Sequence, residues 1–175
     1  MNLETYLYDK LHRFVIVLES EGNPRIKITI NSEVKFDQPL IEDRLIVNCF
    51  KELEKYQPGI LQIEMYGKSN RDTVVKDGVI VKDTTVTVDD VIVNGVSLTK
   101  VGHIHRGVYR PYYWDNYTGD KPETITGART MGFNGTWTYT WDDSPIRHII
   151  NQFDTVEQNS INTNMQDIFD ALDIR

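Results

Sequence analysis

The stretch Thr136-Trp-Thr-Tyr-Thr-Trp141 alternates threonine with a large aromatic residue at every step. Successive side chains of a β-strand point to opposite faces, so this alternation predicts a strand with one polar and one aromatic face. We expect Trp137, Tyr139 and Trp141 to lie in the core, because buried indole and phenol rings contribute much of the stability of a small β-sandwich.

Further strands are predicted by short runs of β-branched residues bounded by turn residues. The dipeptides Asp77-Gly78 and Asn94-Gly95 each separate two such runs, and both are favoured in tight hairpins. The runs are residues 13–18, 25–30, 34–36, 45–50, 60–66, 72–75, 79–81, 85–93 and 96–98. Their regular spacing, without a βαβ rhythm, predicts an all-β protein: an antiparallel, jelly-roll-like β-sandwich with short C-terminal helices.

The length of 175 residues suits one core. We expect a β-sandwich domain over residues 1–153, followed by a polar linker and an amphipathic C-terminal helix over residues 154–175. Residues 102–132 have five glycines and little periodicity, which predicts a long functional loop. A short helix is expected over residues 146–153, because Pro145 suits a first helical turn.

The net charge of −7 argues against non-specific binding to nucleic acid or to an anionic membrane through a basic face. No apolar run approaches transmembrane length, and Glu4, Asp9 and Lys10 argue against a signal peptide, so we expect a protein made in a cytoplasm. Cys49, the single cysteine, excludes an internal disulfide and is expected to be a buried thiol.

Few residues suggest metal binding or catalysis. His103 and His105 would share one face of a strand, but we expect ordinary hydrogen-bonded or exposed histidines because a third ligand is not evident. The pairs Asp89-Asp90 and Asp142-Asp143 are better explained as turn or cap residues than as calcium ligands. Motifs of hydrolases, nucleotide-binding proteins and zinc proteases are missing. The sequence therefore predicts a protein that is not an enzyme and has no cofactor or metal.

The most distinctive candidate site is an aromatic run with Arg110, Asp115 and Asn116 interleaved. Three interpretations stay open: a protein interface, a loop folded back on its own sandwich, and a surface for sugar stacking. We expect the run to bind a partner, which is more readily a protein than a sugar. Its members are Tyr109, Tyr112, Tyr113, Trp114 and Tyr117.

The C-terminal segment carries apolar residues at spacings of three and four, opposite an acidic side. Residues 154–175 contain five carboxylate side chains and one arginine, a net charge of −4. A helix of about ten residues is not stable alone in water, so its apolar stripe must dock on the chain's own sandwich or on a neighbouring subunit. The polar linker of residues 154–160 favours the neighbour. The stripe comprises Ile161, Met165, Ile168, Phe169 and Leu172.

Several short motifs resemble a family of small proteins from tailed bacteriophages, notably phages of marine bacteria, over roughly residues 25–153. The chain is also similar in outline to carbohydrate-binding-module sandwiches, although it lacks an evident calcium loop. The motifs lie at residues 60–68, 70–73, 86–98, 132–137 and 144–146.

The phage resemblance implies a virion location. It implies a head-decoration, neck or tail component with other virion proteins as partners, in a homo-oligomer or symmetric assembly. Two functions therefore remain: a non-enzymatic virion structural protein that acts through protein–protein contacts, and a glycan-binding adhesin or carbohydrate-binding module on the virion surface.

Overall fold

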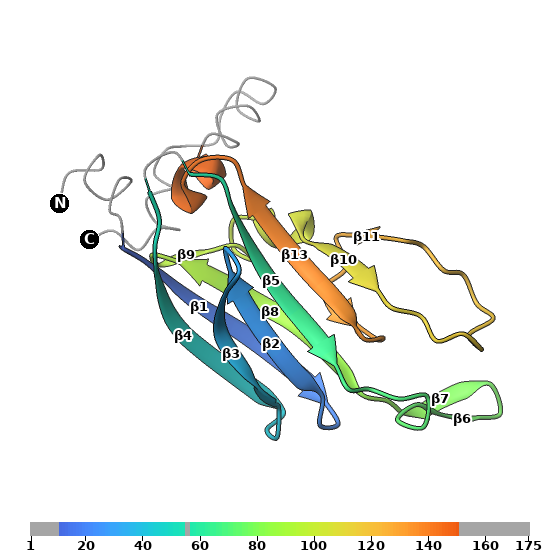
Figure 1. The fold of residues 1–175 in the computed structure, drawn as a ribbon. Helices are drawn as coiled ribbons and strands as arrows, with labels where there is room; N and C mark the ends of the chain where they lie inside the picture. Colours follow the sequence, from blue (N-terminus) through green and yellow to red (C-terminus); the bar gives the residue numbers. More distant parts are fainter. Residues whose placement is uncertain (1–10, 55–56, 151–175) are drawn as a thin grey trace.

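The computed structural model describes residues 11–54 and 57–150, which form a β-sandwich of two antiparallel sheets. The two sheets lie one behind the other, and a short hairpin projects from one end of them (Figure 1). The predicted all-β antiparallel fold is confirmed.

The first sheet has six strands in the order β11-β10-β13-β5-β2-β3. Its strands are β2 (Arg25–Ile30), β3 (Glu33–Pro39), β5 (Gly59–Tyr66), β10 (Val108–Pro111), β11 (Ile125–Thr126) and β13 (Gly135–Trp141). β13 and β5 lie at its centre and pair along their whole length, from Gly135 opposite Met65 to Trp141 opposite Gly59.

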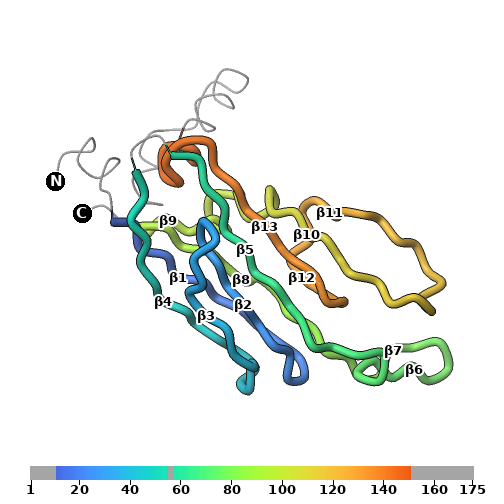
Figure 2. Tube along the Cα trace, in the orientation of Figure 1, coloured from blue at the N-terminus to red at the C-terminus, as the bar shows by residue number. Residues whose placement is uncertain are grey.

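The second sheet has the order β12-β8-β1-β4, with β9 paired to β8 (Figure 2). Its strands are β1 (Leu11–Glu21), β4 (Arg44–Glu52), β8 (Thr85–Val93), β9 (Val96–Ser97) and β12 (Thr130–Met131). A separate two-stranded sheet consists of β6 (Val74–Lys76) and β7 (Val79–Lys82).

The alternation seen in the sequence builds the core. Trp137, Tyr139 and Trp141 on β13 are at most 2% exposed, which confirms their prediction as core residues. The rings lie so close to the backbone that a Cβ atom on Gly107 would approach the Trp137 ring to 2.2 Å, and one on Gly59 would approach the Trp141 ring equally closely. Glycine at both positions is thus a packing requirement of the two indoles.

The predicted tight turns are confirmed by their backbone. Asp77-Gly78 and Asn94-Gly95 all have positive φ values, 51° and 79° in the first turn and 50° and 91° in the second. Two successive residues of this kind form the hairpin turn whose twist matches the flanking strands. Asn94 also ties its turn to β1, because its Oδ1 accepts the Arg13 backbone N–H at 2.8 Å.

A β-bulge explains the acidic pair on β8. The register between β1 and β8 shifts between Val17 and Leu18, which pair with Asp90 and Val88 and leave Asp89 as the extra residue. The Asp90 carboxylate accepts hydrogen bonds from Ser97 Oγ at 2.6 Å and the Thr99 N–H at 3.1 Å. The expected cap role is confirmed for Asp90, whereas both aspartates lie in a strand and not in a turn.

Residues 145–150 are helical, as predicted, with Pro145 as the first helical residue. Ser144 caps this helix by accepting the Arg147 N–H on its Oγ at 3.1 Å. Asp143 forms an ion pair with Arg147 at 3.3 Å. The predicted C-terminal helix and its linker lie outside the described residues. Within residues 11–54 and 57–150, no helix is long and apolar enough to cross a membrane.

Residues 102–132 correct the prediction of one long loop. They contain the 3-10 helix η1 (His103–Arg106) as well as β10, β11 and β12. β11 and β12 have two residues each, too few for a periodic pattern. Cys49 also differs from its expectation: it is half-buried, against the edge of the core.

Candidate functional site

The outer face of the six-stranded sheet carries a groove of about 170 Å³. Outward-pointing positions of three adjacent strands bring its residues together. Lys27 on β2 lies opposite Glu64 on β5, and Glu64 in turn lies opposite Thr136 on β13. The six lining residues are Lys27, Thr29, Gln62, Glu64, Tyr112 and Thr136.

Tyr112 supplies the aromatic wall of this groove. It directly follows β10, and its backbone N–H donates to the Asn134 carbonyl at 2.7 Å. Its hydroxyl lies 3.2 Å from Thr136 Oγ1, while 49% of the residue stays exposed. The ring is therefore fixed at both ends, with much of its surface open to a ligand.

A second ordered cluster extends the same face toward the edge strand β3. Arg25 Nε donates to the Tyr66 hydroxyl at 3.2 Å, and the Tyr66 hydroxyl donates to Asp37. The Arg25 guanidinium also lies over the Tyr66 ring, 5.4 Å from its centre, which is within the range of a cation–π contact. The hydrogen bond to Tyr66 is the largest cause that raises the pKa of Arg25.

The structure separates the five aromatic residues predicted to bind a partner into three settings. Tyr109 is 2% exposed and donates its hydroxyl to the Phe133 carbonyl at 2.7 Å, so it belongs to the core. Burial raises its pKa to about 12. This corrects the prediction for Tyr109, which offers no side-chain surface to a partner. Tyr112 lines the groove.

Tyr113, Trp114 and Tyr117 form a third setting, a small cluster around Phe133. Tyr113 and Tyr117 stack at 5.3 Å, and each meets the Phe133 ring at 4.9 Å. Trp114 packs on Phe133 from a centroid distance of 5.1 Å. All three are half-buried, so the loop folds back on itself and still presents ring surface.

A buried ion pair underlies this aromatic cluster. Lys68 Nζ donates to Asp83 Oδ1 and to the Gly132 carbonyl, both at 2.5 Å, and its side chain is 1% exposed. It lies 5.7 Å from the centre of the Trp114 ring. Burial acts to raise the pKa of Asp83, but hydrogen bonds from Lys68, Thr73 and the Thr84 N–H outweigh it and hold that pKa below its usual value.

The two histidines that share a spacing typical of metal ligands differ in their surroundings. They are on η1 rather than on a strand, so His103 is buried and His105 is exposed, which corrects the shared-face geometry. Burial, helped by the charges of Arg106 and His148, lowers the pKa of His103 to about 4, and His103 Nδ1 lies 3.3 Å from the Tyr139 hydroxyl. Within the described part of the chain, no three metal-binding side chains converge.

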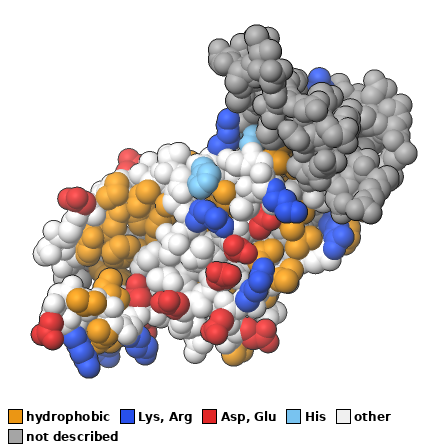
Figure 3. All heavy atoms as spheres, turned by 180° about the vertical axis from the view of Figure 1, so that it is seen from behind, with side chains coloured by type: hydrophobic (Ala, Val, Ile, Leu, Met, Phe, Trp, Pro, Cys, Tyr) orange, Lys and Arg blue, Asp and Glu red, His pale blue; other side chains and the backbone are white. Residues whose placement is uncertain are grey.

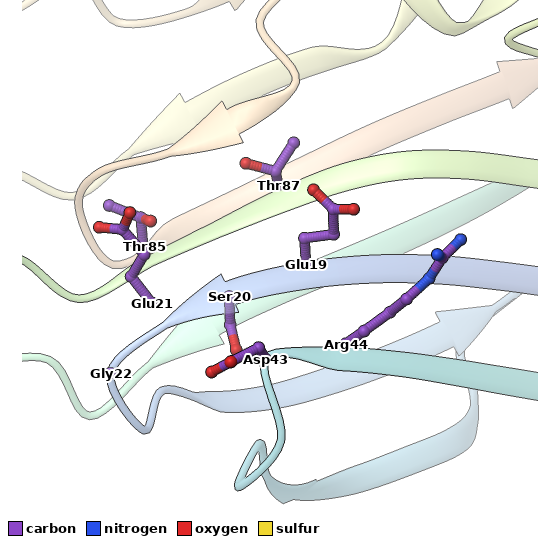
Figure 4. A pocket seen from close by; sticks show the side chains of 8 residues that line it. All are labelled: Glu19, Ser20, Glu21, Gly22, Asp43, Arg44, Thr85 and Thr87. Carbon is purple, nitrogen blue, oxygen red and sulfur yellow. The ribbon is translucent and has the colours of Figure 1, made fainter.

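A larger open hollow of about 640 Å³ lies at one end of the second sheet (Figure 4). Glu19 and Glu21 extend toward Thr87 and Thr85, whereas Asp43 points away from them (Figure 4). The carboxylates do not converge on one point, so the hollow offers an acidic surface and no cation cage.

Sequence reasoning missed the groove residues except Tyr112. The available signal was the polar side of each alternating strand: Lys27 and Thr29 between buried isoleucines, and Gln62 and Glu64 between buried residues of β5. These positions identify a solvent-facing sheet surface. Only the strand order makes them neighbours.

No family model matches the chain, and no curated protein matches it. Among solved structures, it is similar to vCBM60, from a study linking two families of calcium-dependent carbohydrate-binding modules, with 10% identity and a TM-score of 0.49. That match covers 73% of this chain and 89% of the module. A structure of vCBM60 in complex with galactobiose matches with 12% identity and a TM-score of 0.43, covering 73% and 96%.

Proposed function

We propose that the outer face of the six-stranded sheet binds a carbohydrate and that the protein acts as a non-catalytic glycan-binding module. The observation that carries the proposal is the composition of the groove. Around one exposed aromatic ring it places an ammonium group, two hydroxyls, an amide and a carboxylate.

This set of groups matches the chemistry of a sugar. Each sugar hydroxyl donates one hydrogen bond and accepts others, so it needs both kinds of partner close together. Lys27 donates, Glu64 accepts, and Gln62 does both through its amide. The Tyr112 ring offers an apolar surface for the C–H face of a pyranose.

The groove is also held in shape before a ligand arrives. Its three strands are paired in register, and Thr29 Oγ1 donates to Gln62 Oε1 at 3.5 Å across two of them. Sites on strands lose little freedom on binding, which favours weak polar ligands that supply little binding energy. An apolar ligand would leave these polar groups without partners, at a cost of about 1–3 kcal/mol each.

Binding is favoured over cleavage by the number of carboxylates. Hydrolysis of a glycosidic bond ordinarily uses two carboxyl groups on either side of that bond. Among the six residues that line the groove, Glu64 is the one carboxylate.

The experiment is isothermal titration calorimetry of the full chain with a panel of soluble oligosaccharides, compared with Tyr112→Ala and Gln62→Ala. We expect at least one ligand whose affinity falls about tenfold or more in each variant, since each change removes about 1.4 kcal/mol or more of contact. Phe50→Ala is the matched control, because Phe50 is 50% exposed on the opposite sheet. Binding unchanged in both groove variants, or no binding to any sugar, would overturn the proposal.

A second candidate function is a structural role in a virion, which stays a prediction based on sequence resemblance. One observation favours protein–protein contacts of this kind: the apolar surface of the β6–β7 hairpin, where Val79 is 63% exposed. The two functions occupy different faces and are compatible in one protein.

A further inference from the structure

The β6–β7 hairpin is an apolar element that neither main sheet covers. It pairs with neither sheet, and four of its hydrophobic side chains are more than half exposed: Val75, Val79, Ile80 and Val81. At this end of the molecule, hydrophobic side chains lie at the surface beside lysine and arginine side chains (Figure 3). An isolated hairpin is marginally stable in water, and clustered exposed apolar residues mark interaction sites.

The base of the hairpin is firmly attached. Asp83, just after β7, is bound by buried Lys68 and accepts the Thr73 hydroxyl at 2.6 Å. Asp72, just before β6, accepts the backbone N–H and the hydroxyl of Ser69 at 2.7 and 2.9 Å. These contacts hold the apolar strands in a defined position away from the sandwich, so the hairpin is presented to a partner rather than buried in its own core.

The hairpin and its base, residues 68–83, carry four basic and three acidic side chains, a net charge of +1. The exposed side chains of Arg71, Lys76 and Lys82 surround the apolar residues, with Asp77 at the turn. The whole chain carries a net charge of −7. A ligand that suits this surface is therefore an apolar segment with a net negative charge.

We infer that the β6–β7 hairpin receives the C-terminal segment, residues 154–175, of a second copy of this chain. The segment carries a net charge of −4 and an apolar stripe from Ile161 to Leu172, with Asp167 and Asp170 on its other side. The hairpin and the C-terminal segment of the same sequence are thus complementary, because both expose apolar residues and their net charges are opposite.

The length of the chain favours a second copy over the same copy. The helix of residues 145–150 lies at the opposite end of the sandwich from the hairpin (Figure 1). Residues 151–160 reach at most about 35 Å when fully extended. The strand β5, which separates the two ends, already spans about 27 Å, and the hairpin lies beyond a further loop. Docking in the same copy would require a fully stretched linker.

A contact between two different surfaces is heterologous, and it repeats from copy to copy. Such contacts close into a ring or continue as an open chain, depending on the rotation between neighbours. The inference therefore predicts assemblies larger than a dimer at high protein concentration, and association that weakens with salt because opposite charges meet.

The test is analytical ultracentrifugation of the full chain over a range of protein and salt concentrations. We expect the charge reversals Lys76→Glu with Lys82→Glu to weaken association about tenfold or more, and Asp167→Lys with Asp170→Lys to do the same. The control is Lys100→Glu with Arg106→Glu, which makes the same charge change at two exposed residues outside the hairpin.

Mixing the two defective proteins separates docking between copies from docking within one. The hairpin variant retains a normal tail, and the tail variant retains a normal hairpin, so a mixture can form one intact junction per pair. We expect dimers in the mixture although each variant alone is monomeric. A wild-type chain that stays monomeric, association unaffected by both sets of reversals, or a mixture without dimers would each overturn the inference. Sugar binding is a separate readout that none of these outcomes alters.

Discussion

The aromatic residues of β13 and those of the loop after β10 are chemically alike and end in different places. Trp137, Tyr139 and Trp141 alternate with threonine along a strand at the centre of a sheet, and all three are buried. Tyr112, at the start of the loop, faces solvent from the groove. The difference teaches that a periodic aromatic pattern specifies a core. In an aperiodic run, the local backbone determines whether each ring is buried or exposed.

The largest effect is expected for Trp137→Ala. The ring is 0% exposed, packs against the backbone at Gly107 and donates its Nε1–H to the Ala128 carbonyl at 3.1 Å. Its removal should lower the free energy of unfolding by about 3–5 kcal/mol, because it leaves a large cavity and an unsatisfied carbonyl. Urea denaturation followed by tryptophan fluorescence measures the loss. A loss under about 1 kcal/mol would show that β13 is not the centre of the core.

Lys68→Met tests how much the ion pair between Lys68 and Asp83 stabilises the region of the aromatic cluster around Phe133. The substitution keeps the aliphatic length but leaves Asp83 without its cation, and breaking a buried ion pair costs about 3 kcal/mol or more. Lys82→Met, on the exposed end of β7, is the matched control and should change stability by less than about 0.5 kcal/mol. Chemical denaturation of both variants gives the comparison. Equal small losses would mean that Lys68 does not anchor this region.

Sequence reasoning succeeded where both faces of a strand are specified. The runs 25–30 and 85–93 coincide with β2 and β8, since each alternates between buried and solvent-facing positions. β11 and β12 escaped detection because two residues contain no period. β12 is defined by its distant partner, with Met131 placed opposite Val86 of β8.

The candidate site was largely invisible in the sequence for a related reason. Lys27, Glu64 and Thr136 are far apart along the chain, and their adjacency comes from the register of three strands. A polar residue on the outer face of a strand resembles every other such residue until the strand order is known. Tyr112 was identified because it belongs to an aromatic run with no period, which is unusual in a loop.

The buried surroundings of β13 also predict that the stability of the protein depends on pH. His103, which contacts the Tyr139 hydroxyl, has a pKa of about 4 in the folded protein, below the usual 6.5. Between these values the unfolded chain binds a proton that the folded chain does not, so stability falls as the pH drops from about 6.5 to 4. The loss attributable to His103 should reach about 2–3 kcal/mol. Burial lowers the pKa of His148 as well, which adds in the same direction.

Unfolding free energies of the wild type and of His103→Asn, measured at pH 7.5, 6 and 5, check this dependence. Asparagine keeps a polar group near Tyr139 but does not titrate, so the variant should show a flatter pH profile. The same slope in both proteins would assign the dependence to other groups.

The smallest effect on stability is expected in the loop, where Trp114→Ala and Tyr112→Ala divide the aromatic run by function. Trp114 is half-buried against Phe133. Its loss should cost about 1–2 kcal/mol, less than that of a core indole. Tyr112 is an exposed ring. Its removal should change stability by less than about 0.5 kcal/mol.

Thermal unfolding compares the two variants, and oligosaccharide titration supplies the second readout. Because Tyr112 alone of the two lines the groove, its variant should lose sugar affinity while Trp114→Ala retains it. The reverse result would move the binding surface from the sheet face to the cluster around Phe133.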